Sequence, residues 1–196
     1  IRRTFPVPPT AVQKGIGVLG LHEGATLILG LEPAARARAV AGCDLEVDKL
    51  ERVRRARPEL FLTTDYDALL ARTDVDIVAI YAPDALHGEH VERAFRAGKD
   101  VICTKPLVNS MADARSVLAA ARETGRKLLV GQSTRFFEPF LRQRAAFERG
   151  ELGDIELLDA HYVHRMDSSP STTTCATCTP APTAARSPRT RCMPCA

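Results

Sequence analysis

Short apolar runs alternate with helix-like segments from residue 15 to about residue 131. The runs are 16–19, 38–43, 60–63, 76–80, 101–103 and 128–131. Runs this short and this apolar are typical of parallel strands that are buried on both faces of a sheet. We therefore predict six strands in this part of the chain.

Helical patterns fill the intervals between these runs, at 24–31, 47–56, 66–71, 87–97 and 111–123. Ser110 is suited to capping the start of the last of them, and Gly98 and Gly125 are suited to ending two of them. Strands that alternate with helices form βαβ units with right-handed crossovers. The predicted fold class is α/β, a doubly wound parallel sheet of the Rossmann type.

The pattern changes after the sixth run. A helix is predicted over 137–149 and a strand with period-2 alternation over 155–164, which we interpret as the first strand of a second α/β domain. From residue 168 onward the chain has no Leu, Ile, Val, Phe, Lys or acid, so we expect a disordered tail. The predicted organisation is a flexible leader at 1–14, a dinucleotide-binding domain at 15–135, a remnant of the second domain at 136–167 and the tail at 168–196.

The amino-acid composition limits the classes of function that this protein can have. Charged residues make up 26% of the 196 and the net charge is +3, so neither a nucleic-acid partner nor a membrane surface is indicated. No run of about 18 apolar residues suggests a transmembrane helix, and the first residues lack the apolar core of a signal peptide. We expect a cytoplasmic protein.

The cysteines fall into two groups. Cys43 and Cys103 lie on predicted strands, where cysteine is usually a small core residue. The other four form two Cys-x-x-Cys pairs, Cys175 with Cys178 and Cys192 with Cys195, close to the spacing of a zinc ribbon. Because this tail lacks apolar support and turn glycines, we predict no metal site and rank a zinc-binding adaptor third among the functions. Its composition is typical of out-of-frame translation of GC-rich DNA, and we hypothesise a frameshift near codon 167.

Two overlapping glycine patterns compete for the phosphate-binding turn. Residues 15–20 match G-x-G-x-x-G, but the predicted strand runs through the match, so we reject it. Residues 20–25 follow the strand and open the helix, with Gly20 making the tight turn and Ala25 allowing close helix packing. His22 stands where a glycine would let the backbone approach a pyrophosphate, and Gly24 can move that approach along by two residues. Glu23 would compete for the helix amides, so a turn that binds no nucleotide stays open as an alternative.

Asp44 follows the second strand, 24 residues after Gly20. A carboxylate there can accept hydrogen bonds from both ribose hydroxyls of the adenosine half and would repel a 2′-phosphate. The sequence therefore favours NAD over NADP as the cofactor, although an acid at a strand end can also be simply solvated.

Lys105 and Pro106 follow the fifth strand directly. Side chains at the carboxyl ends of parallel strands face the crevice where open α/β sheets bind ligands. Proline fixes its own φ and restrains the residue before it, so the lysine is predicted to lie on a stiff turn, near a substrate hydroxyl or a cofactor ring. A surface lysine at a strand–helix junction is the alternative.

With these residues in order, the chain resembles the Gfo/Idh/MocA family, the relatives of glucose–fructose oxidoreductase and inositol dehydrogenase. Residues 81–87 resemble its Pro-x-x-x-His segment, with Pro83 and His87 along the cofactor. Residues 104–106 resemble its Glu-Lys-Pro motif, with Thr104 in place of the glutamate. Residues 131–136 resemble the segment that closes over the cofactor, with Arg135 at the usual arginine, and 153–155 resemble the start of the second domain.

The resemblance implies NAD(P)-dependent hydride transfer on a sugar, polyol or related secondary alcohol. It assigns Lys105 a catalytic role at the reacting oxygen or the nicotinamide ribose. The implied cofactor contacts are Gly20, His22, Gly24, Ala25, Asp44, Pro83, His87, Lys105, Pro106 and Arg135. The intact family is expected to form oligomers.

The same resemblance places the proton-transferring histidine in a second domain of well over a hundred residues. Neither His161 nor His164 matches its position, so we expect a truncated chain that is inactive as it stands. The alternative is a Rossmann module that binds a nucleotide or another ligand without catalysis, which His22, Glu23 and Thr104 favour.

Overall fold

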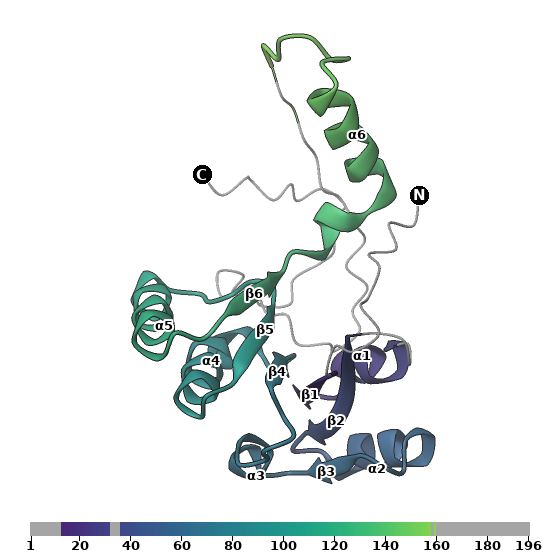
Figure 1. The fold of residues 1–196 in the computed structure, drawn as a ribbon, viewed down its shortest axis with the longest axis vertical. Helices are drawn as coiled ribbons and strands as arrows, with labels where there is room; N and C mark the ends of the chain where they lie inside the picture. Colours follow the sequence, from purple (N-terminus) through teal and green to yellow (C-terminus); the bar gives the residue numbers. More distant parts are fainter. Residues whose placement is uncertain (1–12, 32–35, 158, 160–196) are drawn as a thin grey trace, which may run out of the picture. The chain divides into compact units, whose positions relative to one another are not determined.

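A six-stranded parallel sheet organises the described part of the chain (Figure 1). The computed structural model describes residues 13–31, 36–157 and 159. The strands are β1 (Lys14–Leu19), β2 (Ala37–Cys43), β3 (Phe61–Thr63), β4 (Ile77–Ile80), β5 (Asp100–Thr104) and β6 (Leu128–Gly131). Their order across the sheet is β3-β2-β1-β4-β5-β6, and every pairing is parallel. The predicted doubly wound fold is confirmed.

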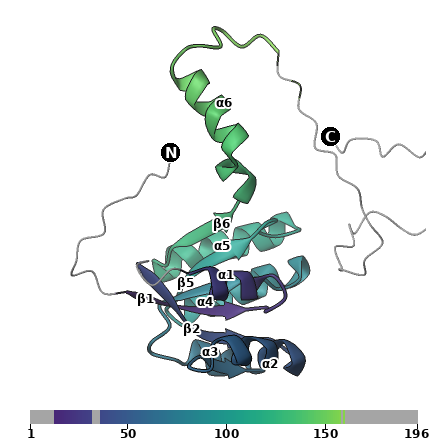
Figure 2. The same ribbon diagram turned by 90° about the vertical axis from the view of Figure 1, so that its right-hand side faces the viewer.

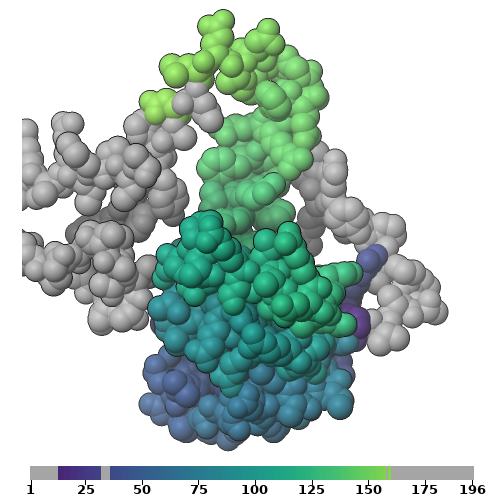
Figure 3. Space-filling view, turned by 90° about the vertical axis from the view of Figure 1, so that its left-hand side faces the viewer, coloured from purple at the N-terminus to yellow at the C-terminus, as the bar shows by residue number. Residues whose placement is uncertain are grey.

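Helices cover both faces of this sheet (Figures 1 and 2). The α-helices are α1 (Gly24–Gly30), α2 (Val47–Ala56), α3 (Tyr66–Leu70), α4 (His87–Arg96), α5 (Met111–Thr124) and α6 (Glu138–Glu148). Two short 3-10 helices that the sequence pattern did not indicate are η1 (Asp84–Leu86) and η2 (Ser133–Phe136). In Figure 3 the side of α4 and α5 faces the viewer as a teal surface.

The core divides into two clusters because the sheet has two faces. One cluster joins α3, α4 and α5 to the sheet through residues such as Leu69, Phe95 and Val117. The other joins α1 and α2 to the opposite face through Ile28 and Val53. The apolar runs of the sequence are therefore buried from both sides, as the pattern indicated.

Helix ends follow the predicted signals. The Ser110 hydroxyl accepts the Asp113 N–H at 3.0 Å and donates to the Asp113 carboxylate at 2.7 Å, which closes the first turn of α5. Gly125 ends α5 with φ of 65°, and Gly98 follows α4 with φ of 75°. Both glycines occupy the left-handed region that stops a helix.

The predicted strand at 155–164 is not found where the chain is described. Residues 155–157 have no strand pairing and are exposed, and 158 and 160–164 lie outside the described residues. Period-2 alternation marks a strand only where a partner supplies hydrogen bonds, and no such partner lies beside 155–157 among the described residues. Of the predicted leader at 1–14, residues 1–12 lie outside the described residues, and the boundary is corrected at Lys14, which is the first residue of β1 because it pairs with Ala37. The predicted tail at 168–196 also lies outside the described residues. Among the helices that are described, none is long and apolar enough to cross a membrane.

Leu69 on α3 provides a test of the core. Its side chain is fully buried, so Leu69→Ala is expected to lower the free energy of unfolding by about 2–5 kcal/mol. Leu118 on α5 is half exposed, and Leu118→Ala makes the same chemical change with an expected effect within about 0.5 kcal/mol. Urea denaturation of both variants measures the difference. Equal losses would contradict the assignment of Leu69 to the core.

The two strand cysteines are predicted to be unreactive in the folded chain. Burial is the main cause that raises the pKa of Cys43 to about 11 and that of Cys103 to about 12. At pH 8 the thiolate fraction of such a group is about a thousandth or less, and only the thiolate reacts. Alkylation followed by peptide mass spectrometry should find both thiols unmodified in buffer and modified in urea. Rapid labelling of either in buffer would contradict this placement.

Candidate functional site

The turn from β1 to α1 lies where the second glycine pattern predicted it. Gly20 has φ of +87°, and a Cβ built on it would lie 2.4 Å from the Tyr81 carbonyl oxygen. The Gly20 N–H donates to the Cys43 carbonyl at 2.8 Å, and the Tyr81 N–H donates to the Leu19 carbonyl at 2.7 Å. Only glycine fits this backbone, which holds β1 against β2 and β4 at their carboxyl ends.

The rejected pattern is part of β1 itself. Gly15 and Gly17 lie inside the strand, and a Cβ on Gly15 would lie 1.8 Å from the Asp74 carbonyl oxygen. On Gly17 it would meet the Leu69 side chain at 2.9 Å. These glycines make room for packing and form no loop.

The backbone of the β1–α1 turn lies at the crevice edge. His22 and Glu23 are exposed, whereas Ala25 is buried and a Cβ on Gly24 would lie 2.6 Å from Val18 Cγ1. Glu23 precedes the first residue of α1 but makes no capping hydrogen bond through its side chain. In this structure the acid therefore does not occupy the helix amides that a phosphate would use.

Asp44 is buried at the end of β2 and is tied to the same turn. Its Oδ2 accepts the Leu21 N–H at 2.7 Å and its Oδ1 accepts the Glu46 N–H at 3.0 Å. A carboxylate has about four acceptor positions, so two remain for further donors such as hydroxyls. The Asp44 carboxylate therefore fixes the backbone of the β1–α1 turn and also places a negative charge at the edge of that turn.

Two cations of α2 reach the Asp44 carboxylate and the turn it holds; the sequence set Lys49 aside as distant from Asp44 and did not indicate Arg52. Lys49 Nζ lies 3.7 Å from Asp44 Oδ2, and Arg52 donates to the Leu21 carbonyl at 3.3 Å. A hydrogen bond to Glu46 is the largest cause that raises the pKa of Lys49. The two stand three apart on α2, and that spacing was a signal that both share one helix face.

The turn after β5 carries Lys105. The Thr104 hydroxyl, which stands where the resemblance expects a glutamate, donates to the Ile80 carbonyl at 3.3 Å. Lys105 is exposed, and no hydrogen bond or ion pair of its ammonium is found within the described residues. The peptide between Lys105 and Pro106 is cis. The lysine is therefore available to a ligand and is not paired with an acid of the described chain.

His87 lies beneath this edge rather than in it. The ring is fully buried at the start of α4, with Nδ1 2.8 Å from the Pro106 carbonyl oxygen and Nε2 2.8 Å from the Ala82 carbonyl oxygen. Both ring nitrogens are thus taken up by backbone groups. Pro83 is exposed at the start of η1.

Arg135 follows the carboxyl end of β6, the strand that pairs with β5. It lies on η2 after β6 and is exposed, and no hydrogen bond or ion pair joins it to them within the described range. The structure thus joins the turns that carry Gly20, Asp44, His87 and Lys105 by hydrogen bonds or adjacent strand ends, whereas Arg135 is linked to them only through the pairing of β6 with β5.

A hollow of about 510 Å³ adjoins the β1–α1 turn. It is lined by Glu23, Thr26, Leu27, Gly30, Leu31 and Tyr81. Burial raises the pKa of the Tyr81 phenol, and the nearby Glu23 carboxylate adds to the shift. The hollow therefore offers a neutral phenol, apolar side chains and one acid beside the turn.

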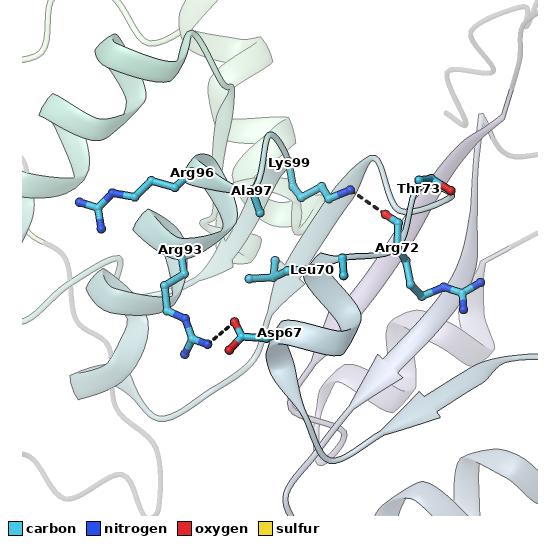
Figure 4. A pocket seen from close by; sticks show the side chains of 9 residues that line it. Asp67, Leu70, Arg72, Thr73, Arg93, Arg96, Ala97 and Lys99 are labelled. Atoms are coloured by element: carbon cyan, nitrogen blue, oxygen red, sulfur yellow. Dashed lines mark hydrogen bonds and ion pairs between the residues drawn. The ribbon is translucent and has the colours of Figure 1, made fainter.

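A second hollow, of about 470 Å³, lies at the opposite end of the strands (Figure 4). It is formed by Asp67, Leu70, Ala71, Arg72, Thr73, Arg93, Arg96, Ala97 and Lys99. Arg93 pairs with Asp67 at 2.6 Å, and Lys99 donates to the Arg72 carbonyl at 2.7 Å. Arg72 and Arg96 have acidic partners of their own. Its cations are therefore engaged, and nothing links it to the predicted site.

A search of the described residues for three or more His, Cys, Asp or Glu side chains able to hold a metal ion finds no such group. The four cysteines at 175–195 lie outside those residues, so the prediction about a zinc site in the tail is not tested.

Comparison with known proteins identifies the family. The model described as "Oxidoreductase family, NAD-binding Rossmann fold", that of Gfo/Idh/MocA, matches residues 15–132. The chain belongs to this family, which confirms the predicted resemblance. The family comprises NAD(P)-dependent oxidoreductases that act on sugars and polyols.

Individual relatives support this family assignment. Inositol 2-dehydrogenase of Gluconacetobacter diazotrophicus is 33% identical over 157 residues, which cover 77% of this chain and 45% of that protein. A mutant 3-ketoreductase from Actinomadura kijaniata, solved with TDP-benzene and NADP, is 32% identical with a TM-score of 0.61, over 73% of this chain and 44% of that one.

Scyllo-inositol dehydrogenase from Lactobacillus casei, solved with NAD(H) and scyllo-inositol, shares the fold. Its TM-score is 0.66 at 23% identity, over 72% of this chain and 43% of that one. The chain spans less than half the length of the curated relatives it matches.

The Gly20 turn can be tested directly. Gly20→Ala places a side chain at positive φ against the Tyr81 carbonyl and is expected to lower the free energy of unfolding by about 1–3 kcal/mol. Gly30→Ala is the matched control, because nothing lies within 4 Å of a Cβ built there. That control should be neutral or stabilising by up to about 1 kcal/mol. Thermal and urea denaturation measure the free energy of unfolding of both variants. If Gly20→Ala is as stable as the wild type, the turn does not have the conformation described.

Proposed function

We propose that this chain, as a member of that oxidoreductase family, binds NAD at the carboxyl edge of its sheet. We further propose that it serves hydride transfer between this cofactor and a sugar, polyol or related secondary alcohol. The observation that carries the proposal is the single edge shared by the Gly20 turn, the buried Asp44 and the Lys105 turn. In open α/β sheets, ligands bind at this edge, at the point where the strand order reverses.

The residues present fit a dinucleotide. Gly20, Gly24 and Ala25 form the turn and the start of α1 beside the exposed His22 and Glu23, and their backbone amides are the proposed donors to a pyrophosphate. Asp44 keeps acceptor positions for ribose hydroxyls while it fixes the Leu21 amide. His22 is exposed on the same turn and is assigned a peripheral contact. When bound, the nicotinamide supplies the hydride acceptor or donor.

Lys105 is the proposed catalytic residue. Its ammonium is exposed at the crevice edge, where a cation can stabilise charge that develops on a reacting oxygen. Thr104 cannot take the place of an acidic partner, because its hydroxyl is directed to the Ile80 carbonyl. Pro83, Pro106 and Arg135 complete the proposed cofactor contacts, with Arg135 approaching from η2.

NAD is preferred in this proposal over NADP. The Asp44 carboxylate lies at the position where a 2′-phosphate would have to fit, and like charges repel there. Lys49 and Arg52 reduce that repulsion, because both approach the same turn. We therefore expect discrimination between the two cofactors that is real but modest.

A ligand-binding module without catalysis is the second candidate. The absence of an acidic partner for Lys105 within the described residues favours it, because nothing there orients the ammonium. The predicted loss of catalysis, the frameshift, the cytoplasmic location and the oligomeric state all stay predictions.

Cofactor titration tests the proposal. Binding to the purified chain should enhance the nicotinamide fluorescence of NADH, with an affinity about tenfold higher than that for NADPH. Asp44→Asn keeps one acceptor for the turn but removes the charge, and should bring the two affinities to within about threefold, since removing one nearby charge is worth about 1 kcal/mol at a partly screened site. Asp48→Asn on the exposed start of α2 should preserve the wild-type ratio.

Two outcomes would count against it. Absence of NADH and NADPH binding would remove both the enzyme and the nucleotide-binding module. Tighter binding of NADPH than NADH by the wild type would reverse the cofactor assignment and point to Lys49 and Arg52 as the groups that decide it.

A further inference from the structure

We propose that two copies of this chain associate through α6, with the two helices antiparallel across a two-fold axis. The contact surface, which we call the α6 face, consists of Phe136, Phe137, Phe140, Leu141 and Phe147, from the end of η2 through α6. It contains none of the proposed cofactor contacts, so this inference goes beyond the proposed function and does not depend on it.

The α6 helix differs from the other α-helices in how little of it is covered. Each of α1 to α5 has buried residues, whereas no residue of η2 or α6 is buried in the described part of the chain. The five side chains of the α6 face are between 42% and 71% exposed. A Phe side chain carries roughly 200 Å² of surface, so the four Phe alone leave on the order of 450 Å² uncovered. Exposed apolar patches of this size mark interaction surfaces.

The helix needs packing that the described chain does not supply. It has 11 residues, and helices shorter than about 12–15 residues are marginal in water by themselves. The pairs Glu138 with Arg142 and Arg144 with Glu148, at 2.8 and 2.7 Å, join exposed side chains one turn apart. Exposed ion pairs contribute little to stability. A partner on the α6 face would provide the missing apolar contacts.

The apolar side chains share one side of the helix. Phe140 and Phe147 are seven positions apart, which is two turns, and Leu141 lies beside Phe140. Arg144 falls between the two Phe residues on the same side. Its guanidinium is held by Glu148, so its charge is balanced on its own helix and its stem can lie along an apolar surface.

A second copy of the chain fits this face in an antiparallel orientation. If Phe140 lies opposite Phe147 of the second copy, then Glu138 lies opposite Arg149 of the second copy, because both pairs are centred on the same point of the helix. Glu138 and Arg149 are eleven positions apart and share one flank of α6, and antiparallel helices bring the same flank of both copies together. The two-fold axis repeats each contact. Both residues already pair within their own copy, so the contact between copies extends those ion pairs.

The size of the face predicts a weak dimer. Two copies would bury about twice the apolar area of one, and with the polar flanks this approaches the low end of specific interfaces, about 1,200 Å² in total. The residues of this sequence after 159 contain no Leu, Ile or Phe, so they offer little apolar surface to cover the face from within one molecule. A second copy supplies an identical apolar face.

Sedimentation equilibrium of the full chain tests the proposal. We expect a monomer–dimer equilibrium with a dissociation constant on the order of micromolar. Leu141→Ser should weaken it about tenfold or more, because burial of one Leu side chain corresponds to at least that factor. Leu118→Ser is the matched control, since it makes the same change on α5 at a side chain that is also half exposed, and it should stay within about twofold of the wild type. Equal effects of the two substitutions would overturn the proposal.

Charge exchange tests the antiparallel arrangement. Glu138→Arg and Arg149→Glu each place like charges opposite one another, and each should weaken the dimer about fivefold at low salt. The double variant restores opposite charges and should return to within about twofold of the wild type. Additive weakening in the double variant would contradict the antiparallel pairing.

Hydrogen exchange of the α6 amides separates a second copy from other occupants of the face. Exchange should slow as the protein concentration passes the dissociation constant, because the dimer stabilises the helix. A chain that stays monomeric overturns the proposal in either of two forms: protected amides would mean that another segment of the same molecule covers the face, and unprotected amides that nothing does. Association that continues beyond the dimer would be non-specific and would also overturn it.

Discussion

The parallel pairing of β1 with β4 is the contact on which the rest of the structure depends. These strands are far apart in the chain but are aligned from Ile16 opposite Ile77 to Leu19 opposite Ile80. The helix after β1 packs on one face of the sheet and the helix after β4 packs on the other. The chain therefore separates at their carboxyl ends, and a crevice edge is formed there.

Backbone contacts fix that edge before any ligand arrives. The Gly20 peptide is pressed against Tyr81, Asp44 holds the Leu21 amide, and Thr104 donates to Ile80. The Asp44 and Thr104 side chains therefore use some of their hydrogen-bonding atoms within the protein, although Asp44 was predicted to bind a ligand. Lys105 differs from them, because its ammonium is exposed and makes no hydrogen bond or ion pair in the described part of the chain. The site is a frame of backbone carbonyls and amides, with the exposed ammonium of Lys105 at its rim.

Most of the fold could be predicted from the sequence because parallel strands buried on both faces leave uninterrupted apolar runs. All six strands lie at the predicted positions to within a few residues, and the ends of α5 follow Ser110 and Gly125. The strand at 155–164 failed in its described part, since alternation reports a suitable surface but not the partner that pairs with it. Much less of the site could be predicted. Lys49 was set aside as distant from Asp44 and Arg52 was missed, because the contacts of both with Asp44 or the β1–α1 turn depend on how α2 packs.

The sequence by itself determined the order of strands and helices, the glycine that must make the tight turn and the family to which the chain belongs. These properties are local, because they follow from spacing, from backbone freedom at Gly20 and from motifs of a few residues. Tertiary structure decided what each functional side chain touches. His87 reads in sequence as one residue of a cofactor segment, yet its ring lies between two carbonyls from turns 19 and 5 residues away. Contacts between segments distant in the chain exist only once the sheet has brought β4 and β5 together, so no local pattern can encode them.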